Sequence, residues 1–322
     1  MNSWSIAQAN LTSVGVLGFI FGFIASRVKS DVRIPEAIYQ FLSIYLLIGI
    51  GLKGGHSLKD ANFSDIVTPS LATIACGIAI PVLAFFILKV IKTLNDVDRG
   101  SIAAHYGSTS LVTFSAALLF LESNKIFVEG FAPALLTVME IPGLVVGIFL
   151  ASRSSSEKVS WAATLKEVLL GKTVLLLIGG LVIGFITSES GYAKVSPFFV
   201  DLLNGFLVLF LLHLGYLAGS NFFEIKQVGL KLAAFGVLFP ILGGAIGVGV
   251  GTVIGLSIGG ATMLGVLSAS ASYIAAPAAV SVALPQASKT LALMSSIGIT
   301  FPFNLIIGIP IYLRFAEFLG AS

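Results

Sequence analysis

Gly107-Ser108-Thr109-Ser110 interrupts one long apolar stretch of this chain, and Ser268-Ala269-Ser270-Ala271-Ser272-Tyr273 interrupts another 160 residues later. Both interruptions bring hydroxyl groups and small residues to a depth where Leu, Ile and Phe would normally face lipid. Polar breaks at corresponding positions of two halves are the sequence feature that best indicates the binding site of a membrane transporter. These two stretches therefore bear on both the fold class and the site.

The composition identifies a membrane protein. Hydrophobic residues make up 57% of the chain and charged residues 10%, whereas a typical soluble domain is about 25% charged. A helix needs about 20 apolar residues to cross a bilayer, while a barrel strand alternates over about ten. We therefore expect an all-α membrane protein with ten transmembrane helices and no soluble domain. The ten segments are 12–28, 35–54, 67–91, 100–121, 127–151, 170–188, 196–218, 229–254, 259–283 and 289–319.

The distribution of positive charge predicts the orientation. Of the 18 Lys and Arg residues, thirteen lie in odd-numbered connections when the N-terminus is counted as zero. The other five, in even-numbered connections, are Lys53, Lys59, Lys125, Lys194 and Arg314. Connections rich in Lys and Arg stay in the cytoplasm, so both termini are expected outside. We expect no nucleic-acid partner and no cofactor.

The chain reads as an internal duplication. Its longest polar stretch, 152–169, separates two halves of five segments each. A shift of 160 positions aligns several residues in the same order: Ser108 with Ser268, Ser110 with Ser270, and Pro142 with Pro302. Because five is odd, the second copy must enter the membrane from the opposite side, as in inverted-repeat transporters. We predict a first repeat over 1–151, a cytoplasmic linker over 152–169 and a second, inverted repeat over 170–322.

The fourth segment of each half carries a break, and we expect the two broken helices to cross near the middle of the membrane. A helix interrupted at Gly107 leaves unpaired N–H groups and a positive dipole end, which together favour an anion. The alternative is that the hydroxyls only bond to their own helix or join two helices. The expected substrate-binding residues are Gly107, Ser108, Thr109, Ser110, Ser268, Ser270, Ser272 and Tyr273.

Glu140 is the one carboxylate deep within a predicted span. Ionisable groups inside the membrane are costly and mark ion or proton pathways. We expect Glu140 to coordinate a cation or carry a proton, a neutral hydrogen-bonded carboxyl being the alternative. Thr300 occupies the corresponding position of the second half and joins the same candidate ion-coupling site. The glycine-rich stretch 243–259 instead predicts close helix packing through small residues.

Five motifs spread over nearly the whole chain give it a resemblance to the sodium-dependent bicarbonate transporter family known from cyanobacterial carbon concentration. They are Arg33-Ile34-Pro35-Glu36-Ala37-Ile38, Ile50-Gly51-Leu52-Lys53-Gly54-Gly55, Gly107-Ser108-Thr109, Met139-Glu140-Ile141-Pro142, and Ser268 to Pro277. The resemblance implies two inverted five-helix repeats, core and gate domains, a homotrimer in the bacterial inner membrane and an elevator-like motion. It also implies that bicarbonate and sodium bind where the broken helices cross.

The chain departs from this family at Tyr273, where the family has an aspartate after its serines. A carboxylate is the natural hard ligand for a cation, so the departure leaves sodium coupling open. The cyanobacterial members also have a longer fifth connection than 152–169, and a soluble regulatory partner on that side. Whether such a partner binds this chain is open as well.

Secondary active transport of a small anion, with sodium-dependent bicarbonate uptake foremost, is the function that these features favour. The alternative is a proton-coupled or uncoupled transporter of another small carboxylate or solute. A membrane-embedded enzyme is a remote alternative, because no HExxH, GxSG, GxGD or DxxD motif lies within a span. The sequence specifies neither the stoichiometry nor the oligomeric state.

Overall fold

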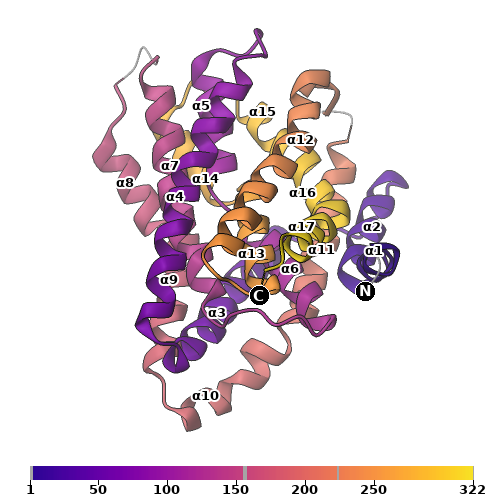
Figure 1. The fold of residues 1–322 in the computed structure, drawn as a ribbon. Helices are drawn as coiled ribbons and strands as arrows, with labels where there is room; N and C mark the ends of the chain where they lie inside the picture. The colour runs from indigo at the N-terminus through magenta and orange to yellow at the C-terminus, as the bar shows by residue number, and fades with distance from the viewer. Residues whose placement is uncertain (1–2, 155–157, 223–224, 322) are drawn as a thin grey trace.

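The computed structural model describes residues 3–154, 158–222 and 225–321, and all regular structure within these ranges is helical (Figure 1). Helices satisfy every backbone hydrogen bond inside their own segment, which an apolar surrounding requires. The first half contains α1 (Ser3–Leu11), α2 (Val14–Arg27), α3 (Glu36–Ser57), α4 (Phe63–Leu88), α5 (Asp96–Gly107), α6 (Leu111–Ser123) and α7 (Ala132–Ser152). The second contains α8 (Trp161–Leu170), α9 (Lys172–Ile186), α10 (Glu189–Ser196), α11 (Leu203–Ser220), α12 (Ile225–Val253), α13 (Ile258–Ala269), α14 (Ala275–Ala283), α15 (Lys289–Leu293), α16 (Phe301–Phe303) and α17 (Ile309–Leu319).

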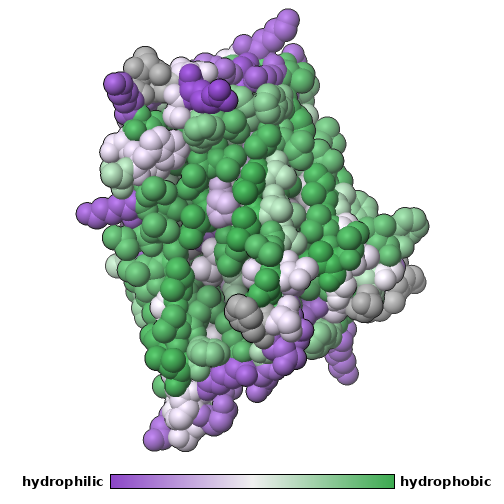
Figure 2. Space-filling view, turned by 60° about the vertical axis from the view of Figure 1, so that its left-hand side comes forward, coloured by the Kyte–Doolittle hydropathy of each residue, from purple (hydrophilic) through white to green (hydrophobic). Residues whose placement is uncertain are grey.

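The described part of the chain has seven helices long and apolar enough to cross a membrane, or up to nine if each of two bent pairs counts as one span. The bent pairs are α1 with α2 and α8 with α9. The predicted segment 259–283 divides into α13 and α14, and neither is long enough to span alone. The class of protein is therefore as predicted, whereas the count of ten helices stays a prediction. Figure 2 shows a broad hydrophobic belt between hydrophilic ends.

Two pairs of closely packed helices form one part of the structure. Helix α2 packs along α11, and α3 packs along α9. A methyl group on Gly22 of α2 would lie 2.0 Å from the Leu212 carbonyl oxygen of α11. One on Gly55 of α3 would lie 2.0 Å from the Leu181 carbonyl oxygen of α9. Small residues let these backbones come into contact. Helices in lipid associate in this way because the hydrophobic effect between them is weak there.

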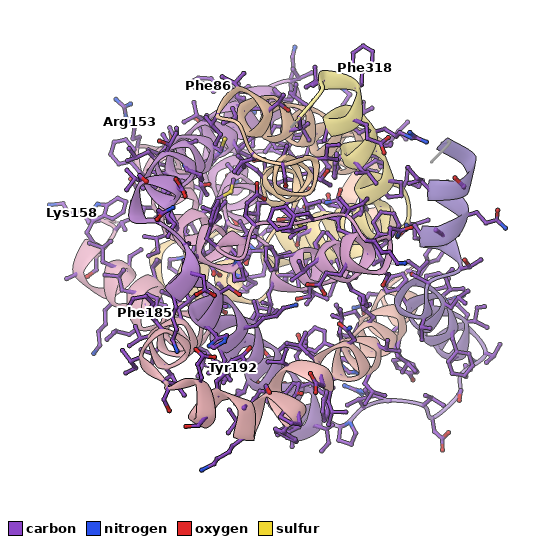
Figure 3. All side chains as sticks on the ribbon, turned by 60° about the horizontal axis from the view of Figure 1, so that its bottom comes forward. Phe86, Arg153, Lys158, Phe185, Tyr192 and Phe318 are labelled. Carbon is purple, nitrogen blue, oxygen red and sulfur yellow. The ribbon has the colours of Figure 1, made fainter. Side chains whose placement is uncertain are left out.

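A second group of helices surrounds the two breaks. Helices α4, α5 and α7 pack together, and α12 packs against α13 and α17. The packing role predicted for 243–259 is confirmed, since a methyl group on Gly243 or Gly247 would lie 2.4 or 2.5 Å from a carbonyl oxygen of α13. Around this group, exposed side chains such as Phe86 and Phe318 point outward at the rim (Figure 3).

Two stretches differ from the predicted boundaries. Segment 127–151 was expected to be helical from its start, but α7 begins at Ala132 because residues 127–130 form a loop. Part of the expected linker 152–169 is helical, since α8 begins at Trp161, while residues 155–157 lie outside the described residues. The last segment is also irregular, because Met294–Thr300 and Asn304–Gly308 are π-helical on either side of α16. Such π-helical turns are frequent at functional sites.

Candidate functional site at the crossing of two broken helices

The first break is an extended segment between α5 and α6. Helix α5 ends at Gly107, and Ser108 and Ser110 both have extended backbone. The Ser110 hydroxyl then accepts a hydrogen bond from the Thr113 N–H at 3.2 Å, which caps the start of α6. Serine favours this capping position because its short side chain reaches an otherwise unpaired N–H. The sequence Ser-Thr-Ser therefore stops one helix and starts the next.

The second break repeats this design between α13 and α14. Helix α13 ends at Ala269, the chain is without helix from Ser270 to Ile274, and α14 begins at Ala275. The Ser272 hydroxyl accepts a hydrogen bond from the Ala276 N–H at 3.2 Å. A buried serine hydroxyl thus accepts an N–H of the first turn in both second half-helices, from the N-cap position in α6 and from two residues before the N-cap Ile274 in α14.

The two breaks contact each other directly. The Ser110 N–H donates to the Ser270 hydroxyl at 3.0 Å, and the Ser110 hydroxyl donates to the Tyr273 hydroxyl at 3.3 Å. A backbone bond from the Ser272 N–H to the His105 carbonyl, 2.7 Å long, joins the second break to α5. All of these residues are buried, so the backbone groups freed by one break are satisfied partly by the other.

A small buried chamber lies beside this contact. Its polar lining consists of Thr109, Ser110, Glu140, Thr173, Ser272 and Tyr273, and its apolar lining of Leu111 and Ile274. The free space is about 10 Å³, which is about what a single water molecule occupies. The chamber therefore has room for an occupant no larger than water.

Glu140 brings a carboxylate into the chamber. The side chain is 2% exposed, and within the described residues its Oε2 atom has no hydrogen-bond partner. The Thr109 hydroxyl, which lines the same chamber, is likewise buried without a partner in the described structure. Unsatisfied buried oxygens are costly, so these two atoms are poised to bind a ligand. No cluster of three or more His, Cys, Asp or Glu that could hold a metal ion occurs in the ranges described.

Helix α7, which carries Glu140, packs directly against the first break because Gly143 on α7 faces Gly107 at the break. A methyl group on Gly143 would lie 1.9 Å from the Gly107 carbonyl oxygen, and one on Gly107 would lie 2.7 Å from the Pro81 ring of α4. Both glycines are therefore needed for close approach of backbones. Gly107 thus positions the break, and its neighbour Ser108 is buried with its hydroxyl unpartnered among the described atoms.

Five of the expected site residues lie outside the chamber lining, namely Gly107, Ser108, Ser268, Ser270 and Thr300. The Thr300 hydroxyl donates to the Gly236 carbonyl at 2.7 Å and also bonds the Tyr106 hydroxyl at 2.6 Å. The Ser268 side chain is packed against Gly247 of α12. Asn304, which the sequence analysis did not predict to be a site residue, contacts the second break. Its side-chain N–H donates to the Ala269 carbonyl at the end of α13, at 2.8 Å.

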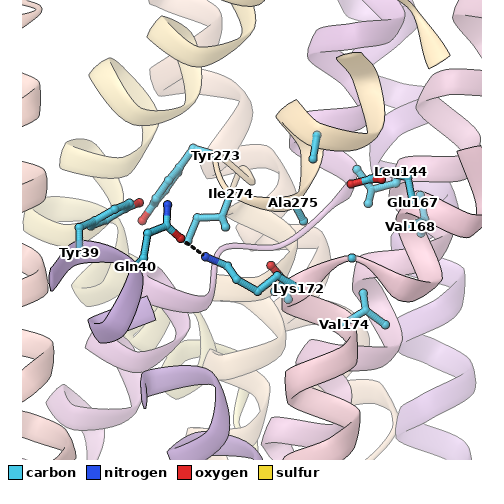
Figure 4. A pocket seen from close by; sticks show the side chains of 13 residues that line it. Tyr39, Gln40, Leu144, Glu167, Val168, Lys172, Val174, Tyr273, Ile274 and Ala275 are labelled. Carbon is cyan, nitrogen blue, oxygen red and sulfur yellow. Dashed lines mark hydrogen bonds between the residues drawn. The ribbon is translucent and has the colours of Figure 1, made fainter. Parts of the chain in front are cut away.

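A larger cavity adjoins the chamber, and we name it the vestibule. It measures about 320 Å³ and shares Thr173, Tyr273 and Ile274 with the chamber lining. Its remaining lining residues are Tyr39, Gln40, Leu144, Glu167, Val168, Gly171, Lys172, Val174, Ala275 and Ala278 (Figure 4). None of these residues was predicted to belong to the site, because the elements that contribute them lie far apart in sequence.

Comparison with known proteins adds the family. Residues 15–317, which are nearly the whole chain, match the model of the Na+-dependent bicarbonate transporter superfamily. A comparison with curated proteins gave no match.

Proposed function

Because the chain belongs to the Na+-dependent bicarbonate transporter superfamily, we propose that it is a secondary transporter that takes up bicarbonate together with sodium. The observation behind this proposal is the crossing of the two breaks, where Ser110 and Ser270 are hydrogen-bonded beside a buried chamber. Helices α6 and α14 both begin at this crossing. Their N-terminal dipole ends and the nearby hydroxyls suit an oxyanion without requiring a fixed positive charge.

The sizes of the two cavities support a proposal of alternating access. Bicarbonate is larger than a water molecule, so the chamber must widen to admit it. The vestibule, which is about 320 Å³, leads toward the ends of α3, α8 and α9 on the side where the charge bias predicts the cytoplasm. The described conformation therefore corresponds to a closed chamber behind an inward-directed vestibule. Residues Thr173, Tyr273 and Ile274 form the partition between them.

Contacts in the structure support the two inverted repeats over 1–151 and 170–322. The pairs α2 with α11 and α3 with α9 are each other's counterparts under such a repeat. Two caps are also counterparts, at a shift of 159 that is one residue short of 160, with donor and acceptor exchanged between the halves. The Ser288 N–H donates to Asp98 at 2.7 Å, and the Ser257 N–H donates to Glu129 at 2.7 Å. We propose that the close pairs form the gate, and that the helices around the breaks form the core.

Glu140 and the Thr109 hydroxyl are our candidates for the sodium ligands. Sodium is a hard cation that prefers oxygen ligands, and both side chains line the chamber with unpartnered oxygens among the described atoms. In this assignment Glu140 supplies the carboxylate that Tyr273 does not. Thr300 stays a candidate by its sequence position alone. The family also suggests four further properties that we add to the proposal. They are the elevator motion, the homotrimer, the inner-membrane location and a regulatory partner on the linker.

Uptake into liposomes tests the proposal. The purified protein is reconstituted, and labelled bicarbonate is followed with and without an inward sodium gradient. We expect uptake that the gradient accelerates. Absence of uptake under both conditions would overturn the bicarbonate assignment, and uptake indifferent to sodium would leave a transporter without sodium coupling.

A proton-coupled carrier of another small carboxylate is the second candidate, and Glu140 is the observation that favours it. A buried carboxylate in the chamber can carry a proton as readily as it binds a cation. The variant Glu140→Gln keeps the shape and removes the charge, so a sodium-coupled carrier should lose the sodium dependence of uptake and a proton-coupled carrier should lose its response to a proton gradient. Glu122→Gln is the matched control, because Glu122 pairs with Lys53 at 2.6 Å near the surface. Sodium-dependent uptake that survives in Glu140→Gln would exclude Glu140 as the coupling residue.

A further inference from the structure

The vestibule contains a helix N-terminus that none of the assignments above uses. Helix α9 begins at Lys172, and its first intrahelical bond runs from the Leu175 N–H to the Gly171 carbonyl at 3.0 Å. The N–H groups of Lys172, Thr173 and Val174 thus lie before this bond, and no side chain caps them. All of these residues except Leu175 line the vestibule. The start of a 15-residue helix carries partial positive charge, and it is directed here at a cavity.

Thr173 provides an independent indication of a ligand. The residue is 6% exposed, and it lines both the vestibule and the chamber. Within the described part of the chain its hydroxyl makes no hydrogen bond. Thr173 is the second residue of α9, so no carbonyl of its own helix lies one turn before it to accept a hydrogen bond. The Thr173 hydroxyl is therefore free to bind a small molecule at the partition.

Lys172 adds the positive charge. Its ammonium group donates to the Gln40 side-chain oxygen at 2.7 Å, as the dashed line in Figure 4 marks. An ammonium group has three N–H donors, so donors remain for a ligand in the cavity. Gln40 is in turn fixed by donating to Glu36 at 2.6 Å. Lys172 is therefore held at the vestibule by α3.

Glu167 limits the negative charge of the ligand that the vestibule can bind. It is the one carboxylate among the vestibule-lining residues, and Lys172 is the one cation. The two make no ion pair within 4.0 Å in the described structure. A single cation and a helix N-terminus attract an anion, while the carboxylate repels a second negative charge. The balance favours a monovalent anion over a divalent one.

We propose that the N-terminus of α9, Lys172 and Thr173 form a second anion-binding site, which holds a small monovalent oxyanion between the chamber and water. The ligand class rests on the proposed function, with bicarbonate as the first candidate. An anion leaving the chamber past Tyr273 would meet the Thr173 hydroxyl at the partition. It would then meet the Lys172 ammonium in the vestibule.

Four variants and one control test this site in two assays. Exchange of labelled bicarbonate across liposomes gives the half-saturating concentration. Thermal unfolding of the detergent-solubilised protein, titrated with sodium bicarbonate, formate or sulfate, reports binding without transport. We expect Lys172→Gln to raise the half-saturating concentration of both monovalent anions about tenfold, the value of a lost charge-assisted hydrogen bond. Thr173→Val should raise it several-fold. Lys166→Gln on α8 removes the same charge from an exposed residue outside the vestibule lining and should change nothing.

Two further variants separate charge from shape. Lys172→Arg keeps the charge and should restore most of the affinity. Glu167→Gln removes the repulsion, so it should lower the half-saturating concentration of bicarbonate and allow sulfate to bind.

The outcomes distinguish this site from the transport assignment. Equal titrations for wild type, Lys172→Gln and Thr173→Val would overturn the second site even if wild-type uptake is robust. If wild type shows no bicarbonate uptake, the proposed function is wrong. Formate stabilisation that is lost in Lys172→Gln would still support the site.

Discussion

Replacing Gly143 by alanine tests whether the first break must rest directly against α7. The added methyl carbon would lie 1.9 Å from the Gly107 carbonyl oxygen and 2.6 Å from the Ser108 N atom. An ordinary contact begins at 3.4 Å, so the break and α7 must separate by about 1.5 Å, the difference between the two distances. Overpacking of this kind destabilises a protein by about 1–3 kcal/mol. Misplacing binding groups by about 1 Å costs about a hundredfold in rate.

The assay is bicarbonate uptake in liposomes, combined with thermal unfolding of the purified variant. We expect Gly143→Ala to lower uptake by about a hundredfold while the protein still folds cooperatively at a reduced melting temperature. Gly249→Ala in α12 is the matched control, because a methyl group there meets nothing within 4 Å. Uptake and melting at wild-type values in Gly143→Ala would refute the view that the break needs this backbone contact.

Further substitutions test single hydrogen bonds near the crossing. Ser270→Ala leaves the buried Ser110 N–H without its partner, so we expect a loss of about 1–3 kcal/mol in the free energy of unfolding, and an unchanged melting temperature would contradict this. Glu129→Gln weakens the charged cap on the Ser257 N–H, and a loss of about 1 kcal/mol is expected from thermal unfolding. An effect of that size should leave the sodium dependence of uptake intact, in contrast to Glu140→Gln.

The sequence indicates where the helices break because serine and glycine have strong local preferences. Ser110 caps α6 at the point where the apolar stretch is interrupted, and this needs only neighbouring residues. The shift of 160 that aligns Ser110 with Ser270 joins two residues that form a hydrogen bond. The fold class likewise follows from composition, since long apolar runs have few ways to satisfy their backbone except as helices.

Other features depend on contacts that no local pattern records. Helix α8 alone falls below the length of a span, so a search for apolar runs passes over it. In the sequence, Lys172 and Thr173 look like an ordinary helix start. Only the structure shows that they line the same cavity as Tyr273. The π-helical turns after Leu293 change the register of the last segment. Position 300, chosen by alignment with Glu140, lies outside the chamber lining and bonds Gly236 and Tyr106.

The hydrogen bond between Ser110 and Ser270 also constrains how the protein is made. A ribosome adds about 5–20 residues per second, so the 160 residues that separate the partners take about 8–32 seconds to synthesise. During that interval the first half sits in or near the membrane with its broken helix incomplete. Ser257 is synthesised shortly before Ser270 and Ser288 shortly after it, and each of them bonds a carboxylate of the first half. Until Ser270 is synthesised, the Ser110 N–H must bond water or another group in place of its partner in the finished structure.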